Sequence, residues 1–143
     1  MHGAVFMKKE FQARHAMGHA VQGSALVAND GFSARYDLDR IRGVFSRPAH
    51  KLAGQSYTGK ILVLDTAKGG VASAWMLYEM ASRGVVPLAL VFNSVNPILA
   101  QGTALAGLPM LAGFDCDITA QLASGDPVEV DPAARVLRVM KSG

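Results

Sequence analysis

The chain has 143 residues, a length typical of one domain with its own hydrophobic core. Half of the residues are hydrophobic and 17% are charged, a composition that suits a domain packed against a partner as well as a free monomer. The formal net charge of +3 is uneven, with +5 over residues 1–60 and −2 over residues 61–143. The basic residues are scattered and aromatic residues are few, which argues against a nucleic-acid partner.

Cysteine usage and hydropathy argue against two further classes of protein. Cys116 is the single cysteine, and one cysteine builds neither a disulfide framework nor a metal site within the chain. The longest uncharged run, residues 84–114, is interrupted by three prolines, so no apolar segment of membrane-spanning length exists. The beginning of the sequence lacks the apolar core of a signal peptide. We therefore expect a cytoplasmic protein without a membrane partner, in which Met7 is a candidate natural start and residues 1–6 an addition.

The first third of the chain is expected to be rich in β-structure. Residues 1–17 are expected to be extended or partly disordered. Residues 18–28 alternate small and apolar side chains and predict a strand that contains Gly23. The Asn-Asp-Gly sequence at residues 29–31 predicts a turn. Residues 35–59, which mix charges with glycines, are expected to form an exposed loop.

Strands and helices alternate from residue 60 onward. The expected strands are residues 61–64, 88–92 and 108–111, and the expected helices are residues 71–82, 97–106 and 117–123. A glycine follows each helix and is typical of a helix C-terminus, namely Gly84, Gly107 and Gly125. This alternation indicates parallel βαβ units. The closing residues 127–140 predict two strands around a turn at Asp131-Pro132. The expected fold class is α/β, with a parallel βαβ core and flanking β-strands in one domain over residues 1–143.

The loop between the first of these strands and its helix is a candidate anion-binding site. It runs from Asp65 to Ser73, DTAKGGVAS, and ends at a helix N-terminus, where backbone N–H groups and the helix dipole favour anions. Lys68 adds a positive charge, and Gly69 and Gly70 allow a ligand to approach the backbone closely. The loop matches neither the Walker pattern nor a GxGxxG fingerprint. A plain glycine turn that joins strand to helix remains the alternative.

The next strand-to-helix loop, residues 93–101, is a second candidate. Polar residues at the carboxyl end of a parallel strand stand where open α/β sheets bind ligands. Asn93, Ser94 and Asn96 could hydrogen-bond a carboxylate or a hydroxyl. The alternative is that Asn96 caps the helix that Pro97 begins, and both interpretations can hold together.

The histidines provide weaker signals, and all of them precede the βαβ region. His15 and His19 are four residues apart but have no acidic ligand nearby in sequence, so no metal site is predicted. His50, in SRPAHKLAG, leaves open a phosphohistidine carrier.

A resemblance to a known family covers nearly the whole chain. The stretch GKILVLDTAKGGVASAWMLYEMASRGVVPLALVFNSVNPILAQGTALAGLPML, residues 59–111, resembles the small swivelling domain of the aconitase X enzymes, a branch of the aconitase superfamily. Residues 18–43 and 125–139 are similar to the flanking strands of that domain. The most specific pieces are KGGVAS and NPILAQG.

The resemblance implies a swivelling β/β/α domain that closes over the active site of a much larger partner. At this length the chain resembles a separate small subunit that is inactive alone. The large subunit would hold an iron–sulfur cluster or metal through its own cysteines, and this chain would bind no cofactor. Members of the family are dehydratases, which act on cis-3-hydroxy-L-proline in bacteria and on mevalonate 5-phosphate in archaea.

The expected function is a hydro-lyase subunit that dehydrates a small hydroxy acid, cis-3-hydroxy-L-proline to pyrroline-2-carboxylate. The first alternative substrate is mevalonate 5-phosphate. It ranks below cis-3-hydroxy-L-proline because its phosphate calls for more basic residues near the loop than Lys68 alone. The other alternative is a non-catalytic anion-binding or regulatory module.

The resemblance also implies roles for individual residues. In the wider superfamily a serine of this loop takes the proton beside the substrate carboxylate, and on this sequence the role falls to Ser73. Helix N-terminal amides and a lysine would support it, because a free hydroxyl is a poor base. Many relatives carry a serine straight after the glycine, where this chain has Gly70 and Val71. The residues expected to position the substrate carboxylate are Lys68, Gly69, Gly70 and Asn96.

Overall fold

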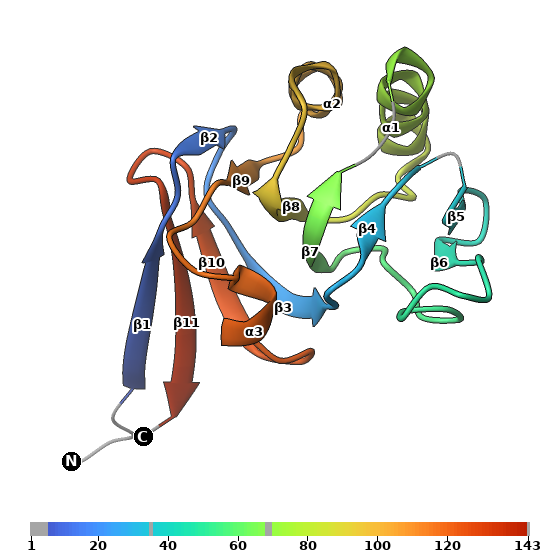
Figure 1. Ribbon diagram of the computed structural model, residues 1–143. Helices are drawn as coiled ribbons and strands as arrows, with labels where there is room; N and C mark the ends of the chain where they lie inside the picture. The colour runs from blue at the N-terminus through green and yellow to red at the C-terminus, as the bar shows by residue number, and fades with distance from the viewer. Residues whose placement is uncertain (1–5, 35, 68–69, 143) are drawn as a thin grey trace.

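The computed structural model describes residues 6–34, 36–67 and 70–142, which form eleven strands and three helices (Figure 1). Nine of these strands form one mixed sheet, and β5 (Leu38–Asp39) and β6 (Val44–Phe45) form a separate pair. Helices α1 (Val71–Arg83) and α2 (Pro97–Leu105) lie together over the central strands in Figure 1. On the other side lie the short helix α3 (Ile118–Gln121) and the outer antiparallel strands.

The centre of the sheet is parallel, as the sequence predicts. Strand β7 (Ile61–Ala67) pairs in parallel with β8 (Ala89–Ser94), and β8 pairs in parallel with β9 (Met110–Ala112). Helices α1 and α2 are the two crossovers of these βαβ units. Both begin and end within a residue or two of the predicted bounds. The α/β fold class is therefore confirmed.

The long strand β3 (Val21–Val27) joins the parallel centre to an antiparallel wing. Its second half pairs in parallel with β7, whereas its first half pairs antiparallel with β10 (Pro127–Asp131). Gly23 lies in the first half, where a Cβ would stand 2.8 Å from Leu88 Cδ2. The wing continues to β11 (Val136–Ser142), which forms the predicted hairpin with β10.

Two further strands come from the start of the chain. Strand β1 (Phe6–Gln12) pairs with β11, and β2 (His15–Met17) pairs antiparallel with β9 at the opposite end of the strand order. The short β4 (Gly31–Phe32), which begins at the last residue of the predicted turn, pairs with β7. The β1 and β2 segments lack a clear alternation of apolar residues, so the sequence did not predict them.

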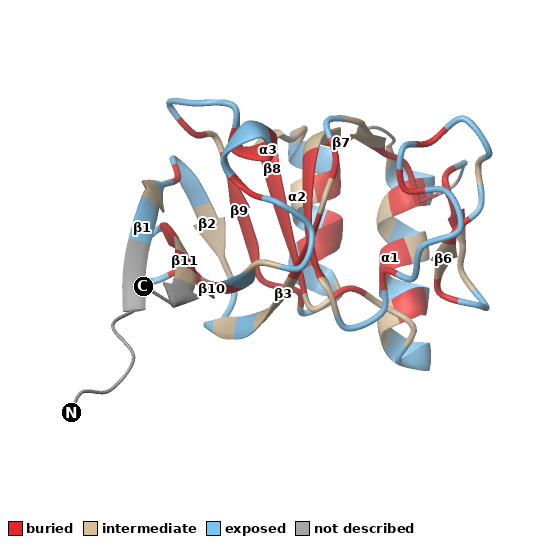
Figure 2. Cartoon of the chain, turned by 90° about the horizontal axis from the view of Figure 1, so that it is seen from below, coloured by how far each residue is buried: buried red, intermediate tan, exposed pale blue. Residues whose placement is uncertain are grey.

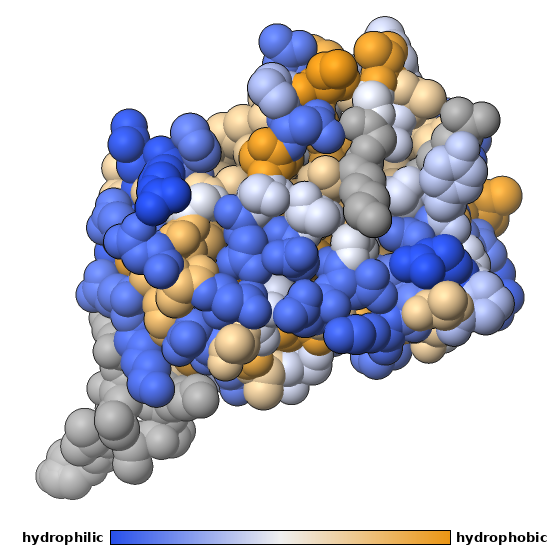
Figure 3. All heavy atoms as spheres, in the orientation of Figure 1, coloured by the Kyte–Doolittle hydropathy of each residue, from blue (hydrophilic) through white to orange (hydrophobic). Residues whose placement is uncertain are grey.

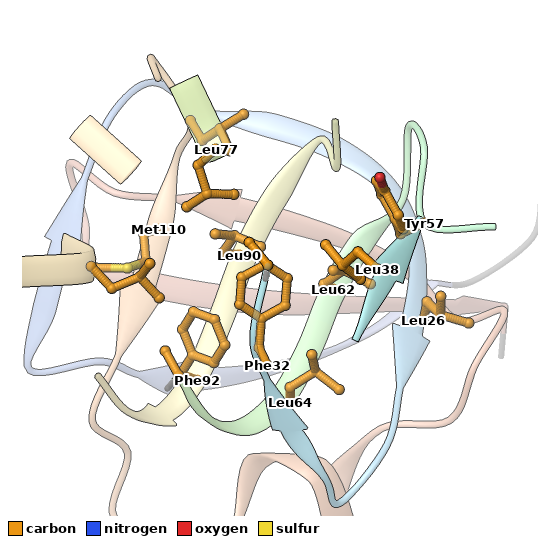
Figure 4. Packing of buried hydrophobic residues seen from close by; sticks show 14 of the residues in the cluster. Leu26, Phe32, Leu38, Tyr57, Leu62, Leu64, Leu77, Leu90, Phe92 and Met110 are labelled. Atoms are coloured by element: carbon orange, nitrogen blue, oxygen red, sulfur yellow. The ribbon is translucent and has the colours of Figure 1, made fainter. Parts of the chain in front are cut away.

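The two faces of the parallel strands form two separate hydrophobic clusters. Alternate side chains of a strand point to opposite faces, so Leu62 and Leu64 belong to the cluster under α1 and α2 (Figure 4). Ile61 and Val63 belong instead to the cluster under α3 and the antiparallel wing. Figure 2 shows the result, with β9 buried throughout and α1 both buried and exposed. Burial on both faces explains the continuous apolar runs of the central strands.

The segment 35–59 corrects the expectation of an exposed loop. Phe45 and Tyr57 are buried, with ring centroids 5.9 Å apart, and they extend the cluster on the helix side. Asp37 is also buried and forms an ion pair with Arg47. The expectation failed because the buried apolar residues of this segment are spread irregularly among charged ones. They show neither helical nor strand periodicity, so the sequence gives no sign that they are buried.

Close packing of α1 against α2 depends on one glycine. A Cβ at Gly102 would stand 2.4 Å from the Cβ and 2.6 Å from the Cα of Ala74. We predict that Gly102→Ala lowers the free energy of unfolding by about 1–3 kcal/mol, because the helices must separate. Helix propensity alone would predict a gain of about 1 kcal/mol. Urea denaturation of the unmodified chain and of Gly102→Ala measures the difference in the free energy of unfolding.

Ala74→Gly is the matched second change for this prediction. Combined with Gly102→Ala, it should recover only part of the loss, because the Cα of Ala74 remains in contact. A stabilised Gly102→Ala chain would contradict the packing described here.

Candidate functional site

The carboxyl ends of the central strands meet at one edge of the sheet. In the register, Thr66 of β7 is opposite Ser94 of β8, and the Ser94 Oγ donates a hydrogen bond to Thr66 Oγ1 at 3.0 Å. Ala112, at the end of β9, is opposite His15 of β2. Both predicted loops and the start of β2 therefore lie at this edge, where open α/β sheets bind ligands.

The first predicted loop is described only in part, because Lys68 and Gly69 lie outside the described residues. Gly70 occupies the N-cap position of α1, and no side chain of the described residues caps this helix end. Among the described residues, no atom stands within 4 Å of a Cβ built at Gly70, and Val71 is 62% exposed. The first turn of α1 therefore presents backbone N–H groups beside open space, the arrangement that favours an anion.

Ser73 lies on the inner face of α1, not at its exposed tip. Its exposed fraction is 2%, and it shares the buried stripe of the helix with Leu77 and Met80. In this conformation the residue offers little surface to a substrate at the sheet edge.

Asn96 is the N-cap of α2, as one of the two sequence interpretations predicts. Its Oδ1 accepts a hydrogen bond from Leu99 N at 2.8 Å, and Pro97 occupies the first turn. The residue is half-buried and also lines an open pocket next to the loop. The cap and a contact with a ligand are compatible.

Asn93 organises a polar network that the sequence did not predict. Its Nδ2 donates to Asp65 Oδ1 at 2.9 Å and to Asp117 Oδ1 at 2.8 Å, and its Oδ1 accepts from Ile118 N at 2.8 Å. Hydrogen bonds from Thr119 and then from Asn93 hold the pKa of Asp117 below its ordinary value. The partners are more than twenty residues apart in sequence, so only the polar ends of the strands hinted at the network.

A basic pocket beside this edge is a second feature absent from the sequence interpretation. It is open, has a volume of about 450 Å³, and lies between β2 and α2. Arg14, His15 and Arg135 contribute its basic groups. Figure 3 shows hydrophilic residues gathered at the upper left, over the β1–β2 and β10–β11 turns. Four chain segments far apart in sequence build the pocket, which is why no local motif indicated it.

Metal ligands and membrane-spanning helices were also sought within the described ranges. There, no three His, Cys, Asp or Glu side chains converge on a common point, and Cys116 is exposed and free. None of the described helices combines the length and apolar character needed to cross a membrane.

A model of one protein family matches most of the chain. It describes the aconitase X swivel domain and covers residues 10–139. The chain belongs to the aconitase X swivel-domain family. The resemblance of the KGGVAS and NPILAQG stretches is thereby confirmed, and the β/β/α swivel architecture agrees with the layers described above.

Curated relatives and a solved structure agree with this family. The chain is 32% identical to the phosphomevalonate dehydratase small subunit of Methanopyrus kandleri, over 81% of this chain and 86% of the relative. The protein of the same name from Thermococcus sibiricus is 32% identical over 84% and 90%. The crystal structure of Thermococcus kodakaraensis aconitase X has a TM-score of 0.86 at 24% identity, covering 93% of this chain and 99% of that chain. This last likeness supports the fold.

The Asn93 network leads to a prediction about pH. Asn93→Asp replaces the shared donor with a third carboxylate beside Asp65 and Asp117, and we expect a loss of about 1–3 kcal/mol in the free energy of unfolding at pH 7. Because Asp117 has a lowered pKa in the folded chain, its hydrogen bonds stabilise the fold above its unfolded pKa and cease to do so as the pH falls through the folded value. The penalty of Asn93→Asp should therefore shrink at about pH 3, below the ordinary pKa of an aspartate, where Asp117 becomes protonated.

The matched control is Asn96→Asp, the same exchange at a helix cap. An aspartate caps a helix N-terminus as well as an asparagine, so little change is expected. Urea denaturation at both pH values measures the effect. If Asn93→Asp lowered the free energy of unfolding equally at both pH values, the result would contradict the role of the network.

Proposed function

We propose that this swivel domain is the small subunit of a two-subunit hydro-lyase that dehydrates a phosphorylated hydroxy acid, mevalonate 5-phosphate. The observation that carries the proposal is the match to phosphomevalonate dehydratase small subunits over more than four-fifths of both chains. In such a dehydration a proton leaves the carbon next to the carboxylate and the hydroxyl leaves the neighbouring carbon, so that water is released and a double bond forms.

The basic pocket changes the balance between the two substrates. From the sequence, mevalonate 5-phosphate ranks second because a phosphate calls for more basic residues near the β7–α1 loop than Lys68 alone. In the structure, Arg14, His15 and Arg135 line a pocket with residues of the β8–α2 loop. The lack of basic residues is therefore no longer an argument against a phosphate. The names of the relatives also favour mevalonate 5-phosphate. The hydroxyproline reaction remains the rival that an assay must test.

The outer face of the two helices suits a large partner subunit. Trp75, Tyr78, Ile98 and Leu105 are between 45% and 68% exposed, and together with Val71 they surround a groove between α1 and α2. Figure 3 shows hydrophobic residues at the top of the molecule, over α1 and α2, interspersed with hydrophilic ones. Exposed apolar patches of this kind mark interaction sites. Val71 and Ile98 lie in the first turns of their helices, so a subunit docked here would also cover the sheet edge.

These positions suggest a separate role for each subunit. This chain would contribute the two loops and the helix N-termini, which bind and orient anionic groups. A metal centre or iron–sulfur cluster, held by cysteines of the large subunit, would draw off the hydroxyl. Ser73 is the proposed proton acceptor on the resemblance to the superfamily, and its burial means that the start of α1 would open when the subunits close on substrate.

The proposed activity predicts a specific pattern of turnover. The chain, co-expressed with its large partner, should dehydrate mevalonate 5-phosphate, whereas the chain alone should be inactive. The assay follows the absorbance of the new conjugated double bond, with mevalonate and cis-3-hydroxy-L-proline as comparison substrates. Turnover of cis-3-hydroxy-L-proline alone would contradict the proposal. Tight binding of a ligand by the isolated chain, with no turnover in the complex, would favour a non-catalytic module.

The role of Ser73 gives a second prediction. Ser73→Ala should lower kcat of the complex at least a hundredfold, because general base catalysis contributes about 10²–10⁴-fold. The unfolding free energy should change little, since a buried serine becomes an alanine beside Leu77 and Met80. Ser82→Ala, which changes an exposed hydroxyl at the other end of α1, is the control and should leave kcat unchanged. Full turnover of Ser73→Ala would exclude the serine as the base.

A further inference from the structure

We propose that the pocket between β2 and α2 is an anion subsite that binds the phosphate group of the substrate, with Arg14 and Arg135 as its cationic contacts. The inference rests on the proposed function for the identity of the substrate. The subsite itself follows from the pocket. It is lined by residues of the β1–β2 turn, the β8–α2 loop and the β10–β11 turn.

Backbone hydrogen bonds hold the two arginines on neighbouring turns. Ala13 N donates to Arg135 O at 2.8 Å, and this bond fastens the β1–β2 turn to the β10–β11 turn. Arg14 N donates to Gly113 O at 2.8 Å, on the other side of the same turn. Gly113 leaves room for this approach, because a Cβ there would stand 3.2 Å from Arg14 Cβ. The backbone of the turn is thus fixed from both sides, which sets the places from which the two arginine side chains extend.

Arg135 adopts an unfavourable backbone conformation at this place. Its φ is +56°, and among the described residues no other non-glycine residue has a positive φ. A left-handed conformation is common for glycine and asparagine but costs energy for a long side chain. An arginine at a hairpin position that suits glycine better indicates that its side chain is needed there.

The charge of the pocket is suited to a strong anion. None of its lining residues, all within the described ranges, is acidic. Arg14 Nη2 forms an ion pair with Asp115 at 2.8 Å, but the two side chains are 67% and 91% exposed. Such an exposed pair contributes little, and one nitrogen of a guanidinium fork leaves its remaining donors for a phosphate. Arginine forks are the preferred ligands where phosphate is bound through two parallel hydrogen bonds.

The position of the pocket fits a ligand with two anionic ends. Asn96 and Pro97 line it, and they begin the helix that follows β8, whose strand end lies beside that of β7. A phosphate in the pocket would leave the carboxylate of the same molecule near the β7–α1 loop. Mevalonate 5-phosphate carries its two anionic groups at opposite ends of a carbon chain, whereas cis-3-hydroxy-L-proline has only one. The subsite therefore accounts for a preference between the two substrates.

Phosphate binding can be tested on the full chain without the partner. Inorganic phosphate should shift the backbone amide resonances of Arg14, His15 and Arg135 in a ¹H–¹⁵N spectrum. Arg14→Gln combined with Arg135→Gly should weaken the apparent affinity about tenfold or more, because two charge-assisted contacts are lost. Arg135→Gly also relieves the left-handed strain, so unfolding would not explain the loss.

The control variant is Arg83→Gln, which removes an exposed arginine that is likewise ion-paired, here with Glu79 on α1. It should bind phosphate as the unmodified chain does. Shifts confined to other regions, or equal binding by the double variant, would overturn the inference. Shifts that saturate only at several hundred millimolar phosphate, with the same response in Arg83→Gln and the double variant, would mark an adventitious ion only and would also overturn it.

Kinetics of the two-subunit complex separate this inference from the proposed function. The Arg14→Gln and Arg135→Gly chain should raise KM for mevalonate 5-phosphate about tenfold or more, with kcat nearly unchanged, since the phosphate is remote from the reacting carbons. An unchanged KM would overturn the subsite. If the complex does not turn over mevalonate 5-phosphate but phosphate still binds at these arginines, the proposed substrate fails and the anion subsite stands.

Discussion

The parallel pairing of β7, β8 and β9 is the constraint on which the rest of the structure depends. Parallel strands end at the same edge, so the loops that follow β7 and β8 must lie side by side. The antiparallel partner β2 begins at the end of β9, and this brings Arg14 and His15 to that edge as well. The crossovers also place the N-termini of α1 and α2 there. A hydrogen-bonding pattern in the buried core thus decides which polar groups meet.

The same constraint explains why the proposed site lies at one edge of the sheet. The sheet edge offers helix N-termini, amides, hydroxyls and arginines, which in the proposed function would hold and orient anions. The exposed apolar residues of α1 and α2 adjoin that edge, so one docked subunit would both cover the apolar surface and enclose the site. Enclosure would strengthen each electrostatic contact with substrate, because interactions gain strength as water is excluded.

Much of the fold followed from local sequence patterns, whereas the site followed only in part. Apolar runs bounded by glycines predicted β7, α1, β8 and α2. The two strands are buried on both faces, so each is a continuous apolar run that is easy to recognise in the sequence. Residues 35–59 were misjudged, since Phe45 and Tyr57 are buried without any period. The helix-capping role of Asn96 was foreseen from its position before Pro97. The Asn93 network and the arginine pocket were not predicted from the sequence, because their residues come from distant segments that only strand pairing brings together.

The central claim is that the carboxyl edge of the sheet faces a large catalytic subunit. Hydrogen exchange of this chain, measured with and without its co-expressed large partner, tests that claim most directly. The account predicts slower exchange in peptides that span residues 13–17, 70–78 and 93–101, with little change over β10 and β11 away from their shared turn. Protection confined to the antiparallel wing, with unchanged exchange at the sheet edge, would contradict it.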